Sequence, residues 1–293
     1  MGTTHTPVLL DEVVQGLIRP EYRLFVDATV GGGGHTYSIL TAHPNLRTYA
    51  IDLDETAIAA ARDRLAPFQD RVTLKKANFR ALKQVLGDDG ISTVDAILFD
   101  LGVSTFQLEG RRGFSFRDTG ALDMRIDQGQ TETALRVVNT YTFEALKQII
   151  ACYGEEWRAA RIARAIVTER KKAPLTSASA LAEVVAKVSR RAGKIHPATK
   201  TFQAIRMEVN QELKNLETGL AAAIDLLACG GRVGVISFHS LEDRMVKGIF
   251  RAAPGLTVLT KKPISPSRPE VQRNPRSRSA KLRIAEKVAK ADA

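Results

Sequence analysis

The sequence predicts an α/β fold: a doubly wound sheet with helices on both faces, interrupted after its fourth strand by an inserted helical domain. Three observations support this. Short apolar runs alternate with helical patterns up to about residue 100, which is typical of parallel strands joined by crossover helices. Four consecutive glycines follow the first apolar run, 24–28. From Gln107 to about Lys194 the alternation is lost and helical periodicity replaces it.

The first half of the sheet is predicted in chain order. Thr6 followed by Pro7 is typical of a helix cap with proline at the first helical position, which predicts a helix from there through Leu17. A second helix is expected from about His35 to Thr41. Asp54 is placed to cap a third. The apolar runs expected to form parallel strands are 24–28, 48–52, 72–75 and 94–99.

The later part predicts a return to the sheet after the insert. Residues 107–140 are polar and loop-like, and three helices are expected at 143–152, 156–172 and 177–191. A long helix from about Thr199 to Leu227 then leads to a fifth strand at 232–238, a helix at 241–250 and a last strand near 282–288. The predicted domains are therefore 1–105 with 204–293 for the sheet and 106–203 for the helical insert.

The glycine turn predicts a cofactor site. Four glycines from Gly31 remove every Cβ where a strand turns into a helix, so a ligand can approach the backbone and the helix N-terminus. Asp52 ends the next strand, where an acid receives ribose hydroxyls in doubly wound folds. The dinucleotide fingerprint fails, because its sixth position is Thr36 or Tyr37 rather than glycine, and no phosphate-gripping loop follows. S-adenosylmethionine (SAM) therefore fits better than NAD or ATP.

Composition predicts a globular enzyme in the cytoplasm. The 293 residues are 44% hydrophobic and 26% charged, and no run of about 18 apolar residues is present. The N-terminal residues lack the basic start and apolar core of a signal peptide. Cys152 and Cys229 lie far apart without a CxxC motif, and the five histidines show no metal-ligand spacing. We therefore expect no membrane span, disulfide framework or metal site; the sequence leaves the oligomeric state open.

The net charge of +11 is unevenly distributed, which predicts a polyanionic partner. Residues 106–203 hold 17 Lys and Arg against 10 Asp and Glu, and residues 261–293 hold 10 against 3. The remainder of the chain is slightly acidic. A nucleic acid that contacts these two regions would account for this distribution.

Several residues near the predicted strand ends admit two roles. Asp100, after the fourth strand, could accept hydrogens from a target amine together with the carbonyl of Leu101, or could contact the methionine part of SAM. His239 could be a general base or a structural histidine. His35 could cap the helix that it starts, and Phe79 could be a core residue or an adenine neighbour.

The chain resembles the bacterial small-subunit ribosomal RNA cytosine-N4 methyltransferases. The matching segments include His5-Thr-Pro-Val-Leu-Leu, the Gly-Gly-Gly-Gly-His loop, Asp100-Leu-Gly-Val-Ser, Arg112-Gly-Phe-Ser-Phe-Arg, Leu122-Asp-Met-Arg, Tyr153-Gly-Glu-Glu, Thr201-Phe-Gln-Ala-Ile-Arg, Ile236-Ser-Phe-His-Ser-Leu-Glu and Asn274-Pro-Arg-Ser-Arg. They span nearly the whole chain in the expected order.

This resemblance implies a class I SAM-dependent methyltransferase sheet and a helical insert for RNA, acting on the N4 amine of a cytosine in the decoding region of 16S rRNA within the small ribosomal subunit. It implies cofactor contacts for Gly33, Gly34, His35, Asp52, Phe79, Asp100 and Gln107. In the basic tail, Arg276, Arg278 and Lys281 are the candidates for RNA contact.

The sequence departs from the family at two places, and two rival functions stay open. Ser104-Thr-Phe-Gln replaces the usual Ser-Ser-Pro-Gln, which leaves the path of the chain into Gln107 open, and Asp118-Thr-Gly-Ala-Leu replaces Asp-Gly-Pro-Leu. Phe106, Phe114 and Phe116 are the candidates to stack on the target base, or else core residues.

The rival functions are a nicotinamide-dependent oxidoreductase, disfavoured by the broken dinucleotide fingerprint, and a non-catalytic RNA-binding or ribosome assembly factor on the same fold.

Overall fold

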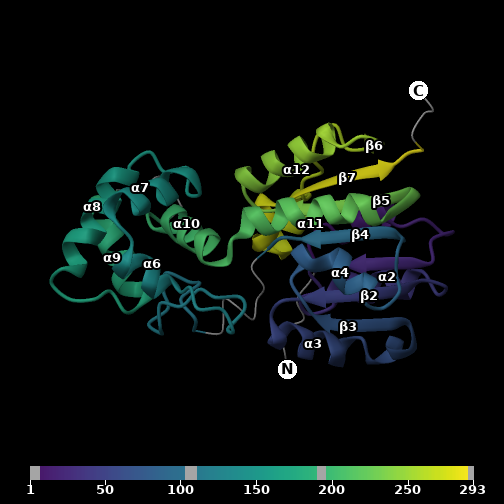
Figure 1. Ribbon diagram of the computed structural model, residues 1–293, viewed down its shortest axis with the longest axis horizontal. Coiled ribbons are helices and arrows are strands. Elements are labelled where there is room, and N and C mark those ends of the chain that lie inside the picture. The colour runs from purple at the N-terminus through teal and green to yellow at the C-terminus, as the bar shows by residue number, and fades with distance from the viewer. Residues whose placement is uncertain (1–6, 103–110, 190–195, 290–293) are drawn as a thin grey trace. The chain divides into compact units, whose positions relative to one another are not determined.

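The computed structural model describes residues 7–102, 111–189 and 196–289. The chain divides into two compact units (Figure 1). The first, here the sheet unit, comprises residues 1–104 and 213–293, and the second, the helical unit, residues 105–212. The chain thus returns to the sheet unit at Leu213, whereas the sequence placed the return at residue 204. The difference arises because the helix before it packs against helices of the insert.

The sheet unit is built on seven strands in the order β3-β2-β1-β4-β5-β7-β6. Their bounds are β1 Leu24–Asp27, β2 Arg47–Asp52, β3 Val72–Lys76, β4 Val94–Asp100, β5 Leu227–Ser237, β6 Leu256–Val258 and β7 Lys281–Lys287. The pairs among β1 to β5 are parallel, as predicted. The four predicted strands of the first half and the last strand near 282–288 are confirmed to within a few residues.

The sheet is not wholly parallel, because β7 runs antiparallel to both β5 and β6. β6, which the sequence did not predict, is antiparallel to β7 and so points the same way as β5. The chain that leaves β6 therefore runs towards the carboxyl edge of the sheet, where β7 begins. A strand that begins at that edge can only run back across the sheet.

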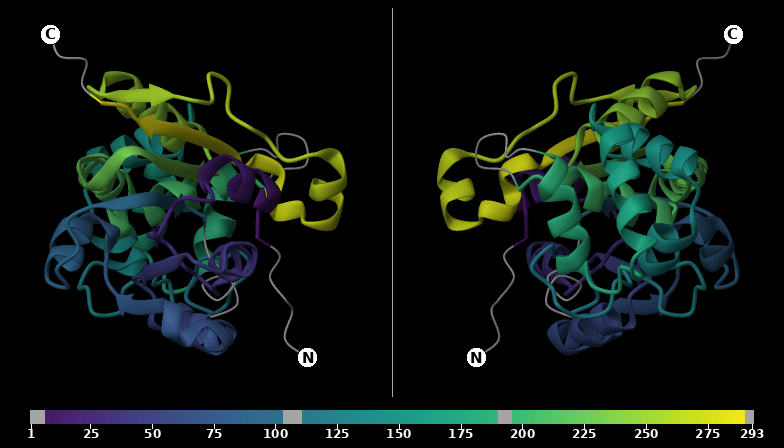
Figure 2. Two further views of the ribbon diagram at one scale, coloured as in Figure 1. Left: turned by 90° about the vertical axis from the view of Figure 1, so that its right-hand side faces the viewer. Right: turned by 90° about the vertical axis from the view of Figure 1, so that its left-hand side faces the viewer.

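Helices cover both faces of this sheet, as predicted (Figures 1 and 2). They are α1 Leu10–Leu17, α2 Gly34–Ala42, α3 Glu55–Arg64, α4 Leu82–Gly87, α11 Glu212–Leu226, α12 Ser240–Ala252 and α13 Arg268–Arg273, with the 3-10 turns η1 Ala66–Arg71, η2 Phe79–Ala81 and η3 Pro275–Ser279. One apolar core lies under α4, α11 and α12, and another under α1 and α2. Asp54 caps α3 as expected, its side chain accepting the N–H of Thr56 at 3.0 Å.

The predicted start of the first helix at Pro7 is wrong, and its predicted cap, Thr6, lies outside the described residues. α1 begins at Leu10, because Leu9 adopts a left-handed conformation with φ of 54°. The N–H of Leu9 donates to Oε1 of Glu270 in α13 at 2.8 Å. This contact holds the start of α1 beside the tail, as Figure 2 shows for the purple and yellow segments.

The predicted long helix at 199–227 is two helices. α10 (Thr199–Asn210) is ended by its C-cap residue Gln211, whose φ of 50° is left-handed, and α11 begins at the next residue. Arg206 bridges the break within the helical unit through two 2.8 Å hydrogen bonds to the carboxylate of Glu212. β5 then begins at Leu227, five residues before the predicted strand at 232.

The helical unit packs its helices around one apolar core. Their bounds are α6 Ala134–Thr140, α7 Phe143–Cys152, α8 Ala159–Arg170, α9 Ala178–Val188 and α10. α7 matches its prediction, while α8 and α9 lie inside the wider predicted ranges. α6 falls in the stretch predicted to be loop, where Thr133 caps it and its buried face is only Ala134, Val137 and Val138. So short an apolar stripe gives little helical signal.

None of the helices in the described part of the chain combines the length and apolar character needed to cross a membrane.

Candidate active site

Three carboxylates gather at one edge of the sheet. Asp27, Asp52 and Asp100 are the last residues of β1, β2 and β4. These strands are parallel neighbours, so their carboxyl ends meet at the same edge. In an open α/β sheet that edge is where ligands bind.

The glycine turn connects this edge to α2. Gly31 and Gly33 have φ values of 50° and 75°, which favour glycine, and the N–H of Gly33 donates to the carbonyl of Val30 at 2.8 Å. Gly34 opens α2, and a Cβ there would lie 2.6 Å from Cγ of Pro7. The glycines at 33 and 34 therefore satisfy backbone and packing demands in addition to the predicted approach of a ligand.

Asp52 holds the turn through its carboxylate. One oxygen accepts the N–H of Gly31 and the other that of Asp54, both at 2.9 Å. Burial raises the pKa of Asp52 to about 6, against the effect of these backbone hydrogen bonds. Each oxygen keeps a lone pair for a ribose hydroxyl.

Asp27 and two threonines form a buried network beneath the turn. Asp27 is 2% exposed and accepts hydrogen bonds from Thr36 Oγ1 at 2.6 Å and from the N–H of Thr29 at 3.2 Å. Thr29 Oγ1 in turn accepts the N–H of Asp100 at 2.6 Å. Burial raises the pKa of Asp27 to about 6. The network thereby ties the end of β1 to the end of β4.

One carboxylate oxygen of Asp100 accepts no hydrogen bond from the described residues. Its Oδ1 is buried and has no hydrogen-bond partner within the described residues. Burial raises the pKa of Asp100 to about 7, opposed by the N–H of Gly102 and reinforced by the negative charge of Glu242. A buried acceptor left unpaired typically costs about 1–3 kcal/mol, so this position suits a ligand with an N–H donor or positive charge. SAM, with its ammonium and sulfonium groups, fits that requirement.

His35 faces Asp100 without capping its helix. The N-cap of α2 is Gly33, and Nε2 of His35 donates to the carbonyl of Val8 at 2.9 Å. Nδ1 lies 3.7 Å from Oδ2 of Asp100. Burial lowers the pKa of His35, which disfavours a positive charge on the ring next to Asp100.

The aromatic candidates pack in their own units. Phe79 is half-buried, with its ring 5.5 Å from that of Phe99 in an edge-to-face arrangement. In the helical unit, Phe114 and Phe116 pack against the core, and Phe116 stacks on His196 at 4.2 Å. The packing of Phe79 on Phe99 is compatible with both roles, that of a core residue and that of an adenine neighbour. Phe106 and Gln107 lie outside the described residues.

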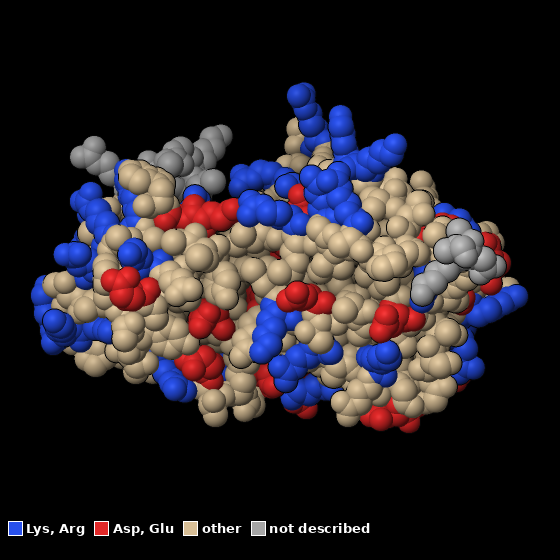
Figure 3. Space-filling view, turned by 45° about the horizontal axis from the view of Figure 1, so that its top comes forward, with Lys and Arg blue, Asp and Glu red and all other residues tan. Residues whose placement is uncertain are grey.

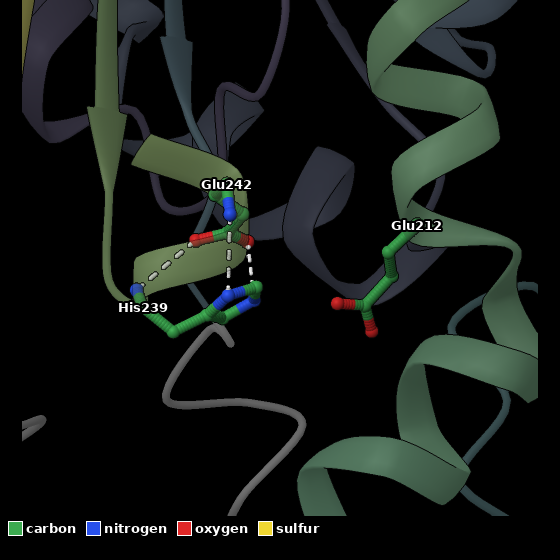
Figure 4. Close-up of side chains that lie close together, drawn as sticks. All are labelled: Glu212, His239 and Glu242. Atoms are coloured by element: carbon green, nitrogen blue, oxygen red, sulfur yellow. Dashed lines mark hydrogen bonds and ion pairs between the residues drawn. The ribbon is translucent and has the colours of Figure 1, made fainter. Parts of the chain in front are cut away.

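His239 is the N-cap of α12 (Figure 4). Its Nδ1 accepts the N–H of Glu242 at 3.4 Å, so this nitrogen carries no hydrogen and the ring hydrogen is on Nε2. Nε2 lies 3.0 Å from Oε1 of Glu242, but the two atoms are not aligned for a hydrogen bond. Oε2 of Glu242 accepts the backbone N–H groups of Phe238 and His239. While this cap is formed, neither ring nitrogen serves as a base, which favours the structural role.

The basic tail residues differ in their contacts. Arg276 and Arg278 lie in η3 and are exposed. Lys281 begins β7 and lies 3.3 Å from Oδ2 of Asp243, which also pairs with Arg283 at 2.6 Å. Part of the charge of Lys281 is therefore already balanced within the sheet unit.

Sequence reasoning missed Thr29 and Thr36. Nothing in a threonine after a strand or in a first helical turn indicates that its hydroxyl will meet a buried carboxylate. Asp27 did give a signal, because an acid inside an apolar strand must find hydrogen-bond donors when buried.

The fold and site define a class of protein. Antiparallel β7 lies between β5 and β6, whereas the dinucleotide-binding fold continues directly from its fifth to its sixth strand. The glycine turn lacks the pyrophosphate fingerprint, and acids end β1, β2 and β4. This is a class I SAM-dependent methyltransferase, and its cofactor is SAM.

Comparison with known proteins gives the family. The sequence matches the MraW methylase family over residues 2–288. It is 50% identical over 290 residues to the ribosomal RNA small subunit methyltransferase H of a Sulfurihydrogenibium species, covering 97% of this chain and 99% of that protein. The protein of the same name from Persephonella marina is 49% identical over 290 residues, with the same coverage. The chain belongs to the MraW methylase family.

Proposed function

We propose that this methyltransferase transfers the methyl group of SAM to the N4 amine of a cytosine in the decoding region of 16S rRNA, acting in the cytoplasm on the small ribosomal subunit. The names of its relatives support a small-subunit rRNA substrate. The observation that carries the chemistry is Oδ1 of Asp100, a buried acceptor without a partner in the described chain.

The target amine needs such an acceptor. The lone pair of the cytosine amine is delocalised into the ring, which makes the nitrogen a weak nucleophile. The carboxylate of Asp100 accepts one amine hydrogen, and the carbonyl of Leu101 accepts the other. These contacts favour a tetrahedral nitrogen with its lone pair directed at the methyl group. As the N–C bond forms, the S–C bond of SAM would break to leave S-adenosylhomocysteine, and the amine would release one proton to the carboxylate of Asp100.

The glycine turn and the acids around it would hold the cofactor. Bound SAM supplies a methyl group activated by its sulfonium centre. Asp52 accepts the ribose hydroxyls, and the backbone of Gly33 and Gly34 lies against the ligand. The full set proposed to contact SAM is Gly33, Gly34, His35, Asp52, Phe79, Asp100 and Gln107.

The helical unit and the tail would bind the RNA. Basic side chains are prominent on the surface drawn in Figure 3. The stretch 106–203 holds 17 Lys and Arg against 10 acids, and the tail 261–293 holds 10 against 3. Phosphates are bound by such clusters with release of counterions. Arg276 and Arg278 are the main candidates in the tail, and Lys281, paired with Asp243, contributes less.

Transfer to small ribosomal subunits tests this proposal. Subunits from a strain that lacks the enzyme are incubated with radiolabelled SAM, and the rRNA is digested to nucleosides. We expect the label in N4-methylcytidine from a single 16S position. Label in another nucleoside would refute the proposed target, and stable binding without transfer would favour the non-catalytic assembly factor.

A further inference from the structure

The helical unit exposes its tryptophan to solvent. Trp157 is 81% exposed, and it is the only tryptophan of the chain. Tryptophan is usually well buried, because it offers the largest apolar area of any side chain. Exposure of nearly the whole ring leaves at least one aromatic face open to a ligand.

The loop that carries Trp157 is held firmly. A Cβ on the buried Gly154 would lie 2.6 Å from the carbonyl of Ile150, so the chain passes close to α7. The carbonyl of Glu155 accepts a hydrogen bond from Lys200 Nζ at 2.8 Å, and that of Tyr153 accepts one from Gln203 Nε2 at 2.9 Å. The loop is therefore anchored to α10, and its outward direction is set by the fold.

Positive charge accompanies the exposed ring. The guanidinium of Arg158 lies over the Trp157 ring, 4.4 Å from its centroid. Arg161, one turn further along, is exposed. Of the two neighbouring acids, Glu156 is only 8% exposed and its carboxylate accepts the N–H of Arg158, so Glu155 is the one that faces solvent. The ring thus lies beside the guanidinium of Arg158, and only Glu155 of the two acids that precede it in the chain is exposed.

We propose that Trp157 and Arg158 form a stacking site for an unpaired base of the RNA substrate. The inference rests on the proposed function and names a contact that it leaves open. An aromatic face with an adjacent arginine suits a nucleotide, because the base stacks on the ring while the cation meets the phosphate. A protein partner would be expected to cover a larger apolar area, and Trp157 and Leu135 are the only large apolar side chains exposed in the described part of this unit.

The single tryptophan makes a direct test available. The fluorescence of the unmodified protein is followed during titration with a single-stranded RNA of mixed sequence and, separately, with the fully paired duplex of the same length. Stacking predicts saturable quenching by the single strand and much less by the duplex. Equal quenching by both, or none by either, would overturn the stacking site.

Variants separate stacking from charge. Trp157→Ala is expected to weaken binding of small subunits about five- to a hundredfold, while Trp157→Phe, which keeps an aromatic face, recovers most of the affinity. Leu135→Ala is the matched control, since Leu135 is an exposed apolar residue of the same unit, at 41%. Arg158→Gln should lower the slope of log affinity against log salt by about 0.7.

The remaining outcomes distinguish this inference from the proposed function. If Trp157→Ala binds and methylates subunits like the unmodified protein, the stacking site is refuted and the proposed function stands. If the unmodified protein transfers no methyl group to subunits, the proposed function fails, whatever the quenching shows. A blue shift of the fluorescence that grows with protein concentration in the absence of RNA would identify Trp157 as a contact between protein molecules and overturn the inference.

Discussion

Acidic residues in two regions of this methyltransferase have opposite pKa shifts: those at the carboxyl edge of the sheet, and Asp123 in the helical unit. In the sheet unit, burial raises the pKa of Asp27 and Asp52 to about 6 and of Asp100 to about 7. In the helical unit, burial also acts to raise the pKa of Asp123, but Arg125 lowers it overall through hydrogen bonds of 2.7 and 2.9 Å and its charge. The acids at the sheet edge accept mainly from backbone N–H and hydroxyl groups, whereas Asp123 has a guanidinium of its own.

This difference indicates a division of labour. A carboxyl group that is desolvated without a cation is ready for a positively charged or hydrogen-donating ligand. A carboxylate that is already paired with arginine is structural, and it leaves the remaining arginines of its unit to bind an outside anion. We therefore propose that the sheet unit is organised for the cofactor and the chemistry, and the helical unit for recognition.

The largest effect is expected for Asp100→Asn, which changes the acid proposed to act in the chemical step. The amide is a weaker acceptor and can direct a donor at the amine. We expect single-turnover methyl transfer at saturating SAM to fall about a hundredfold or more, with a much smaller change in SAM affinity. If instead SAM binding is lost and saturated transfer is normal, Asp100 is a cofactor ligand, and the carbonyl of Leu101 or His239 must hold the amine.

Asp52→Ala is expected to weaken SAM binding about ten- to a hundredfold, because it removes a charged acceptor for the ribose hydroxyls. Calorimetry measures the change. Asp95→Ala is the matched control: Asp95 also accepts two backbone N–H groups, from Arg23 and Leu24, but next to the amino ends of the strands. Equal effects of the two variants on SAM affinity would show that Asp52 acts only by supporting the backbone.

Thr29→Val tests whether the buried network positions Asp100. The valine is similar in shape and removes the acceptor of the Asp100 N–H. The loss of one such hydrogen bond predicts a two- to tenfold slower methyl transfer, roughly. Thr29→Ser keeps the hydroxyl and should restore the rate. If valine and serine behave alike, the hydroxyl does not contribute to positioning.

Neutralising the tail separates the two functions of the chain. Arg276→Gln with Arg278→Gln should weaken subunit binding and lower the salt slope by about 1.4, with SAM affinity unchanged. Adding Lys281→Gln should change the slope less than either arginine, because Asp243 already pairs with this lysine. Lys83→Gln, another surface lysine paired with an acid, serves as the control. An unaltered slope would make the tail structural.

The smallest effect concerns pH and stability. The pKa of Asp100 is raised above the usual carboxyl value, so between about pH 4 and 7 the folded chain keeps a proton that the unfolded chain has lost. The stabilisation of the folded state by this bound proton is therefore full below about pH 4 and is lost as the pH rises to about 7. Without SAM, we expect the melting temperature of the unmodified protein to fall a few degrees more between pH 5 and 8 than that of Asp100→Asn. Parallel melting curves would contradict the raised pKa.

Local sequence determined most of the sheet and the positions of its acids. Apolar runs of strand length ending in Asp52 and Asp100, with glycines from Gly31, predict strands whose ends meet at one edge. These features depend on residue type and short-range periodicity, which can be read from the sequence. The helices of the insert followed from the same periodicity, except for α6, whose buried stripe is too short to recognise.

The surroundings of those acids depend on contacts between residues that lie far apart in the sequence. His35 meets the carbonyl of Val8, Thr29 meets the N–H of Asp100, and Lys281 meets Asp243, pairs that lie 27 to 71 residues apart. The left-handed Gln211 and the antiparallel direction of β7 likewise depend on where the returning chain packs. A partner or a pKa is set by the groups that folding brings within a few ångströms, and local pattern does not encode that proximity.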